Sequence, residues 1–173
     1  FMGSGTAVLE ATLHHNFTKA YGIDINPLAI LISKVKTTPI NYNELSNEYK
    51  ILIGNCEQGL NEINFENKYI EIPKFYNIDF WFKSYVIREL MVIKNNIELI
   101  KNPNIKNFFY VAFSETVRNV SNTRNSEYKL YRMNEEMLSR HNPNVLGSFQ
   151  IKAKNNIVKM RDYTTEINSK CEV

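Results

Sequence analysis

The sequence has few of the residues that build metal sites and disulfide frameworks. Its 173 residues include only two cysteines, Cys56 and Cys171, which lie far apart and have no partner at metal-ligand spacing. Its three histidines, His14, His15 and His141, form no cluster with cysteine or carboxylate residues. We therefore predict no metal centre and two reduced thiols.

Long apolar runs are also missing. A membrane-spanning helix needs about 20 consecutive, mostly apolar residues, and the apolar runs of this chain are much shorter. No amino-terminal signal peptide is visible either. We expect no membrane partner and a cytoplasmic location.

The charge is unevenly distributed along the chain. Residues 1–82 hold 6 basic and 9 acidic side chains, a net charge of −3, whereas residues 83–173 hold 15 and 9, a net charge of +6. A basic second half is compatible with nucleic-acid binding. A solvated helical surface would explain the modest excess equally well.

Glycines are few, but two of the six stand at the beginning of the sequence, at Gly3 and Gly5. Apolar residues over 6–16 predict a short helix after them, and residues 20–23 predict a buried strand that ends at Asp24. This order is typical of the cofactor half of a nucleotide-type βαβ unit. Because such a turn follows a strand, we expect the chain to begin within a larger protein.

The residue types at this turn suit a nucleotide-like ligand. Glycines allow a tight turn and close approach of the ligand, and Ser4 or Thr6 could cap the following helix, whose first amides face the ligand. A carboxylate roughly 20 residues later is placed to accept bonds from ribose hydroxyls, and Asp24 fits that spacing. A plain capping turn with a solvated aspartate is the alternative.

Two short motifs carry a family resemblance. Phe-Met-Gly-Ser-Gly-Thr at 1–6 and Gly-Ile-Asp-Ile-Asn-Pro at 22–27 resemble the first two motifs of S-adenosylmethionine-dependent DNA amino-methyltransferases of restriction–modification systems. Those enzymes methylate exocyclic amines of adenine or cytosine. The resemblance implies S-adenosylmethionine as cofactor and DNA as partner. The residues it assigns to the cofactor are Phe1, Gly3, Ser4, Gly5, Thr6, Asp24, Ile25 and Asn26. Asp24 would hold the ribose, and Ile25 would pack on the adenine ring.

One motif of that family is absent. Its catalytic loop contains a Pro-Pro pair after Asp, Asn or Ser, whereas the five prolines of this chain are all isolated. We therefore assign no catalytic residue and expect a fragment. The missing remainder of the methyltransferase would lie in the same or a neighbouring chain, and we expect the gene to continue past Val173 into a Pro-Pro-Tyr-like sequence.

The resemblance and the patterns together predict an α/β fold, a partial Rossmann-like methyltransferase sheet with a helical insertion or subdomain. Apolar periodicity predicts helices over 27–37, 43–60, 84–101, 103–120 and 145–167, and alternation predicts a short strand over 69–72. We divide the chain into a cofactor-binding part at 1–75, a helical subdomain at 76–168 and the start of a possible further strand at 169–173.

Six aromatic residues cluster between the two parts. They are Phe75, Tyr76, Phe80, Trp81, Phe82 and Tyr85. A core or an interdomain seam is one interpretation, and a surface on which a base or partner stacks is the other.

A polar segment within the helical part is rich in donors suited to phosphates and base edges. The candidate nucleic-acid contacts are Arg118, Asn122, Arg124, Lys129 and Arg132. A polar loop that only connects helices is the alternative.

Three functions stay open at this stage. The first is part of a site-specific DNA methyltransferase. The second is a catalytically inactive remnant or split-gene fragment that binds nucleic acid or a partner chain. The third is methylation of RNA or protein by the same kind of domain.

Overall fold

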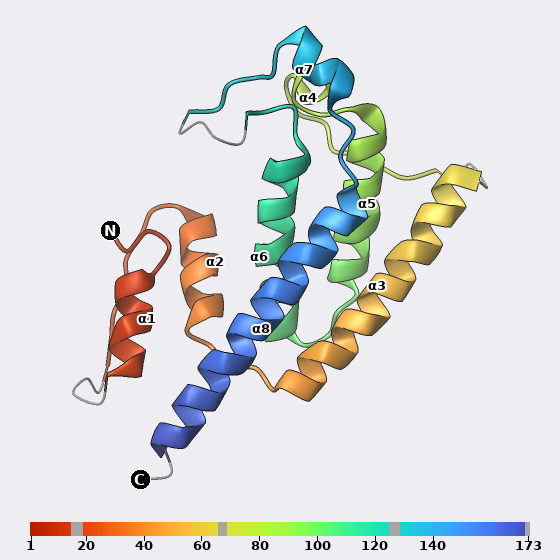
Figure 1. The fold of residues 1–173 in the computed structure, drawn as a ribbon. Helices are drawn as coiled ribbons and strands as arrows, with labels where there is room; N and C mark the ends of the chain where they lie inside the picture. The colour runs from red at the N-terminus through yellow and green to blue at the C-terminus, as the bar shows by residue number, and fades with distance from the viewer. Residues whose placement is uncertain (15–18, 66–68, 125–128, 172–173) are drawn as a thin grey trace.

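A computed structural model describes residues 1–14, 19–65, 69–124 and 129–171, with side chains described as far as residue 167. The regular secondary structure of these residues consists of helices, which are connected by turns and irregular segments (Figure 1). The helices are α1 (Thr6–Leu13), α2 (Pro27–Lys36), α3 (Tyr42–Phe65), α4 (Ile78–Trp81), α5 (Ser84–Glu98), α6 (Pro103–Val120), α7 (Glu135–Arg140) and α8 (Val145–Cys171).

The predicted α/β fold with a Rossmann-like sheet is wrong for the part of the chain that the structure describes. Residues 20–23 form no strand and are exposed rather than buried, and residues 69–72 form no strand either. A sheet requires a ladder of paired backbones. The segment at 20–23 makes one such bond, from Met2 N–H to Ile23 O at 2.9 Å. Within the described ranges, the β-type pairing is limited to an isolated antiparallel bridge between Thr123 and Arg132.

The carboxyl-terminal strand is also not observed. Helix α8 continues through residues 169–171, and residues 172–173 lie outside the described residues. Likewise, α1 ends at Leu13, and residues 15–16 of the expected first helix lie outside the described residues.

The predicted helices of the later chain are confirmed, and two of them begin as the sequence indicated. Pro27 and Pro103 stand in the first turns of α2 and α6, where a missing N–H costs nothing. Asn26 caps α2 by accepting from Leu28 N–H, and Asn102 caps α6 by accepting from the amides of Asn104 and Ile105. Such caps satisfy amides that have no partner within the helix.

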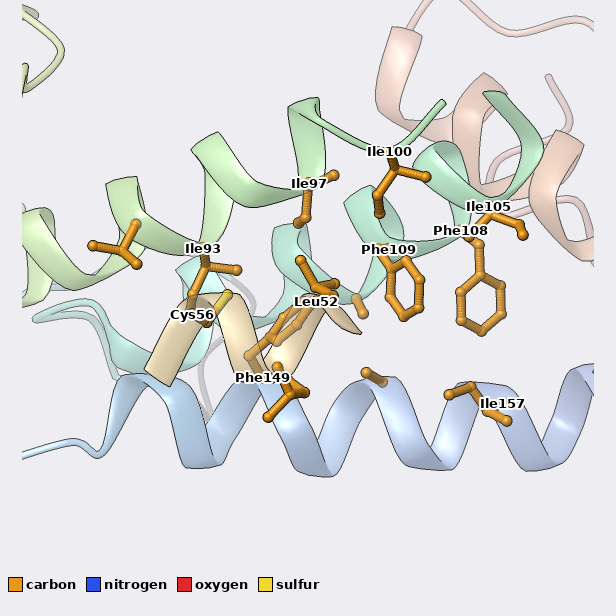
Figure 2. Packing of buried hydrophobic residues seen from close by; sticks show 14 of the residues in the cluster. Leu52, Cys56, Ile93, Ile97, Ile100, Ile105, Phe108, Phe109, Phe149 and Ile157 are labelled. Carbon is orange, nitrogen blue, oxygen red and sulfur yellow. The ribbon is translucent and has the colours of Figure 1, made fainter. Parts of the chain in front are cut away.

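The core lies between α3, α5, α6 and α8, whose apolar faces meet (Figure 2). Phe108, Phe109 and Phe149 are almost fully buried there, and the rings of Phe109 and Phe149 have centroids 6.4 Å apart. On α8, four residues that recur at helical spacing are all buried: Phe149, Ala153, Ile157 and Met160. Helix α3 contributes Leu45, Leu52 and Cys56 to the same core.

Helices α1 and α2 lie together beside this helical layer (Figure 1). Helix α2 packs on α6. The hydroxyls of Thr12 and Tyr163 are 3.3 Å apart, and Thr164 Oγ1 donates to Ile40 O at 3.3 Å, so α8 contacts both α1 and the segment after α2. In the described part of the chain, no helix has the length and apolar character needed to cross a membrane.

A glycine turn closed by an aspartate as the candidate functional site

The two glycines form a tight turn at the start of α1. Gly5 N–H donates to Met2 O at 3.0 Å. Gly3 and Gly5 have φ values of +54° and +74°, in the left-handed region that residues with a Cβ rarely adopt. Gly5 is also the residue that precedes α1, and no side chain caps the helix. The predicted capping by Ser4 or Thr6 is therefore wrong, because the N-cap position is Gly5, which has no side chain to accept a bond.

Asp24 closes the turn from the other side. Its Oδ2 accepts Gly3 N–H at 2.8 Å, and its Oδ1 accepts Asn26 N–H at 2.9 Å. These two backbone donors, that of Asn26 first, hold the pKa of the carboxyl below its ordinary value. Each carboxylate oxygen has a second lone pair, so Asp24 can accept further bonds from a ligand while it holds the turn.

Helix α2 packs against the turn through Ser33 and Lys36. A Cβ on Gly5 would lie 2.2 Å from Ser33 Oγ, so the helix approaches the glycine directly. Lys36 Nζ donates to Ser4 O at 3.0 Å. The sequence analysis missed both residues. Their spacing of three places them on one face of the helix, but it does not indicate that this face packs on the turn.

The remaining residues assigned to the cofactor differ in their exposure and hydrogen bonding near the turn. Phe1 and Ile25 are exposed beside it. Asn26 is engaged at both its amide and its side chain, since its N–H bonds Asp24 and its Oδ1 caps α2. Tyr21, Ile23 and Ile25 alternate along the extended segment and are 80% exposed or more, so an apolar row faces outward next to the turn.

The candidate nucleic-acid segment is built around Phe80. Its carbonyl accepts from Asn122 Nδ2 at 3.1 Å and from Arg132 Nε at 3.0 Å. The Arg132 guanidinium lies 4.6 Å from the Phe80 ring centroid and bonds Glu135 at 3.0 Å. Asn122 is buried. These two side chains therefore hold α4 and the segment together.

The other three candidates are placed differently. Arg118, in the last turn of α6, and Lys129 are exposed, whereas Arg124 is half-buried and its N–H donates to Tyr131 O at 2.9 Å. Of the six neighbouring aromatic residues, Phe82 and Tyr85 pack against the core. Phe75, Tyr76 and Phe80 are exposed, and Trp81, Phe82 and Tyr85 are half-buried.

A positive-φ glycine turn, followed by a helix and closed by a carboxylate, is the kind of site that nucleotide-like ligands occupy. The chain is 42% identical, over 98% of its length, to the Type II methyltransferase M.MvaI of Kocuria varians. The resemblance to restriction–modification methyltransferases that the opening motifs predicted is thus confirmed. The chain spans 37% of the length of that relative. No protein-family model matches the chain, and no solved structure matches it.

Proposed function

We propose that this chain is the donor-binding part of a DNA methyltransferase that transfers a methyl group from S-adenosylmethionine to an exocyclic amine of adenine or cytosine. The observation that carries the proposal is the 2.8 Å bond from Gly3 N–H to Asp24. It brings together two motifs separated by 21 residues, as the resemblance requires. The similarity to M.MvaI over 98% of the chain supports the same assignment.

The residues at the turn fit the chemistry of the donor. The free lone pairs of Asp24 suit a pair of ribose hydroxyls, and the exposed Ile25 side chain suits the face of an adenine ring. When bound, the donor supplies a methyl group already activated on a sulfonium. The task of this chain is therefore to bind and orient the donor, which requires no nucleophile or base of its own.

For the DNA partner, we propose the surface formed by residues 118–124 and 129–132. Exposed Arg118 and Lys129 would contact phosphates, whereas Asn122, Arg124 and Arg132 would shape the segment that carries them. Phosphate contacts fix position on the duplex without reading its sequence. The base chosen for methylation is then determined elsewhere in the enzyme.

Calorimetric titration of the chain with S-adenosylmethionine tests donor binding. We expect saturable heat for the wild type and a large loss of affinity for Asp24→Asn, which keeps the shape of the side chain but removes the charge. Asp162→Asn is the matched control, because Asp162 is exposed on α8. Absence of binding by the wild type, or equal binding by Asp24→Asn, would contradict the proposal.

A second candidate is a catalytically inactive remnant or split-gene fragment that binds nucleic acid or a partner. The absence of any Pro-Pro pair in the chain favours it. Mixing the chain with the remainder of the methyltransferase, labelled donor and DNA separates the two. Methyl incorporation into DNA supports the enzyme, and its absence despite donor binding favours the remnant. Parallel reactions with RNA and with protein test the substrate class.

A further inference from the structure

The glycine turn contacts two side chains of opposite charge, one at each end of the Gly3–Ser4 dipeptide. Asp24 accepts the N–H of Gly3 at 2.8 Å, and Lys36 donates to the carbonyl of Ser4 at 3.0 Å. Lys36 is 32 residues away from Ser4 in sequence and comes from the last turn of α2. The turn is therefore held by a residue outside both motifs that identified it.

The contact of Lys36 adds a side-chain constraint on the Ser4–Gly5 peptide group. Ser4 stands between Gly3 and Gly5, both at positive φ, and glycine loses more conformational freedom on ordering than any other residue. The turn therefore needs several bonds to stay in one conformation. The Ser4–Gly5 peptide group is held on its N–H side by the bond from Gly5 N–H to Met2 O at 3.0 Å. The half-buried Lys36 side chain fixes the Ser4 carbonyl, and Asp24 fixes the Gly3 amide.

We propose that Lys36 is a positioning residue for the methyl donor. Lys36 holds the glycine turn in its binding conformation before the donor binds. This inference rests on the proposed function. A turn that is ordered in advance loses less conformational entropy on binding, so the same contacts give a higher affinity. Lys36 acts through Ser4 and is assigned no contact with the reacting atoms.

The chain offers a matched control on the same turn of helix. Lys34 and Lys36 both stand in the last turn of α2, where either cation interacts favourably with the helix dipole. The Lys34 side chain is exposed. Lys34→Met therefore reports the effect of losing a cation from this helix end, and Lys36→Met reports that effect together with the lost bond to Ser4.

The test measures S-adenosylmethionine affinity by calorimetry for the wild type, Lys36→Met, Lys36→Arg and Lys34→Met. We expect about three- to tenfold weaker binding by Lys36→Met, partial recovery in Lys36→Arg and wild-type affinity in Lys34→Met. Lys36→Met and Lys34→Met should have similar thermal midpoints, because both lose a cation from the end of α2. Unchanged affinity of Lys36→Met, or a loss of affinity that only follows a fall in thermal midpoint, would overturn the inference.

A second measurement works without any donor. Gly5 N–H bonds Met2 O within the turn, so its hydrogen exchange reports the order of the turn directly. We expect faster exchange of this amide in Lys36→Met than in Lys34→Met. If the wild type binds no donor, the proposed function fails. Equal exchange in the two variants instead refutes the role of Lys36.

Discussion

Ser33 lies so close to Gly5 that the glycine has no room for a side chain. A Cβ on Gly5 would be 2.2 Å from Ser33 Oγ and 2.9 Å from Ser33 Cα. The second distance involves backbone, which cannot move aside as a flexible side chain can. Helix α2 and the turn therefore fit together only when residue 5 is glycine.

Gly5→Ala should be markedly more harmful than Gly3→Ala. Both add a Cβ at positive φ, which costs about 1–2 kcal/mol, but only Gly5→Ala also overlaps α2, at a further cost of about 1–3 kcal/mol. A Cβ on Gly3 would have nothing within 4 Å. Urea unfolding followed by circular dichroism measures both variants. Equal free energies of unfolding would show that the contact with Ser33 is not tight.

The turn should loosen in acid. The pKa of Asp24 lies below its ordinary value of 3.8, chiefly because of the bond from Asn26 N–H and then that from Gly3 N–H. A carboxyl with a lowered folded-state pKa stabilises the turn above the unfolded pKa, and this contribution is lost as the pH falls through the folded pKa. We expect the amide chemical shifts of Gly3 and Asn26 to titrate below pH 3.8. In Asp24→Asn this titration should disappear.

Phe149→Ala should destabilise the helical layer by about 3–5 kcal/mol, the usual cost of a large cavity in a core. Phe149 is fully buried, whereas Ile151, two residues further along α8, is 61% exposed. Ile151→Ala is therefore the control, and we expect it to change the free energy of unfolding by less than about 0.5 kcal/mol. Similar losses in both variants would mean that α8 faces the core differently.

Cys56 should be inert in the folded protein. Burial, and to a smaller extent the charge of Glu57, raise the pKa of its thiol to about 12, so the reactive thiolate is scarce at neutral pH. In a Cys171→Ser background, we expect a thiol reagent to modify Cys56 only when urea unfolds the chain. Rapid modification in buffer would place Cys56 outside the core.

Asn122→Ala should lower protein stability, whereas Lys129→Ala should weaken DNA binding. Asn122 is buried and donates to Phe80 O, so its loss should lower the free energy of unfolding by about 1–3 kcal/mol. Lys129 is exposed. In the complete enzyme, Lys129→Ala should leave stability unchanged. It should make the slope of the logarithm of the DNA-binding constant against the logarithm of salt concentration shallower, by the amount expected for the loss of about one phosphate contact. A salt dependence equal to that of the wild type would remove Lys129 from the proposed interface.

The long helices could be predicted because their apolar residues recur at helical spacing. Ile93 and Ile97 on α5, and Phe149 and Ile157 on α8, are buried as this spacing indicated. Pro27 and Pro103 marked where two helices begin. The short helices α4 and α7 were missed, because four or six residues are too few to show a period.

The residues at 20–23 could not by themselves show whether this segment forms a strand. A short apolar run does not by itself distinguish a strand from other buried segments, and a strand exists only when a neighbouring backbone pairs with it. The approach of Gly3 to Asp24 was foreseeable from the family motifs. The contact of Lys36 with Ser4 was not, because it depends on how α2 packs against the turn and on the rotamers of a long side chain.

Helix α8 links the two ends of the molecule described above. Its 27 residues span roughly 40 Å at the usual rise of an α-helix. Tyr163, at the start of its carboxyl-terminal third, contacts Thr12 of α1, while Tyr85 bonds Asn142 at 3.0 Å just before its first turn. The helix therefore sets the distance between the glycine turn, where we propose that the donor binds, and the surface proposed to contact the DNA backbone.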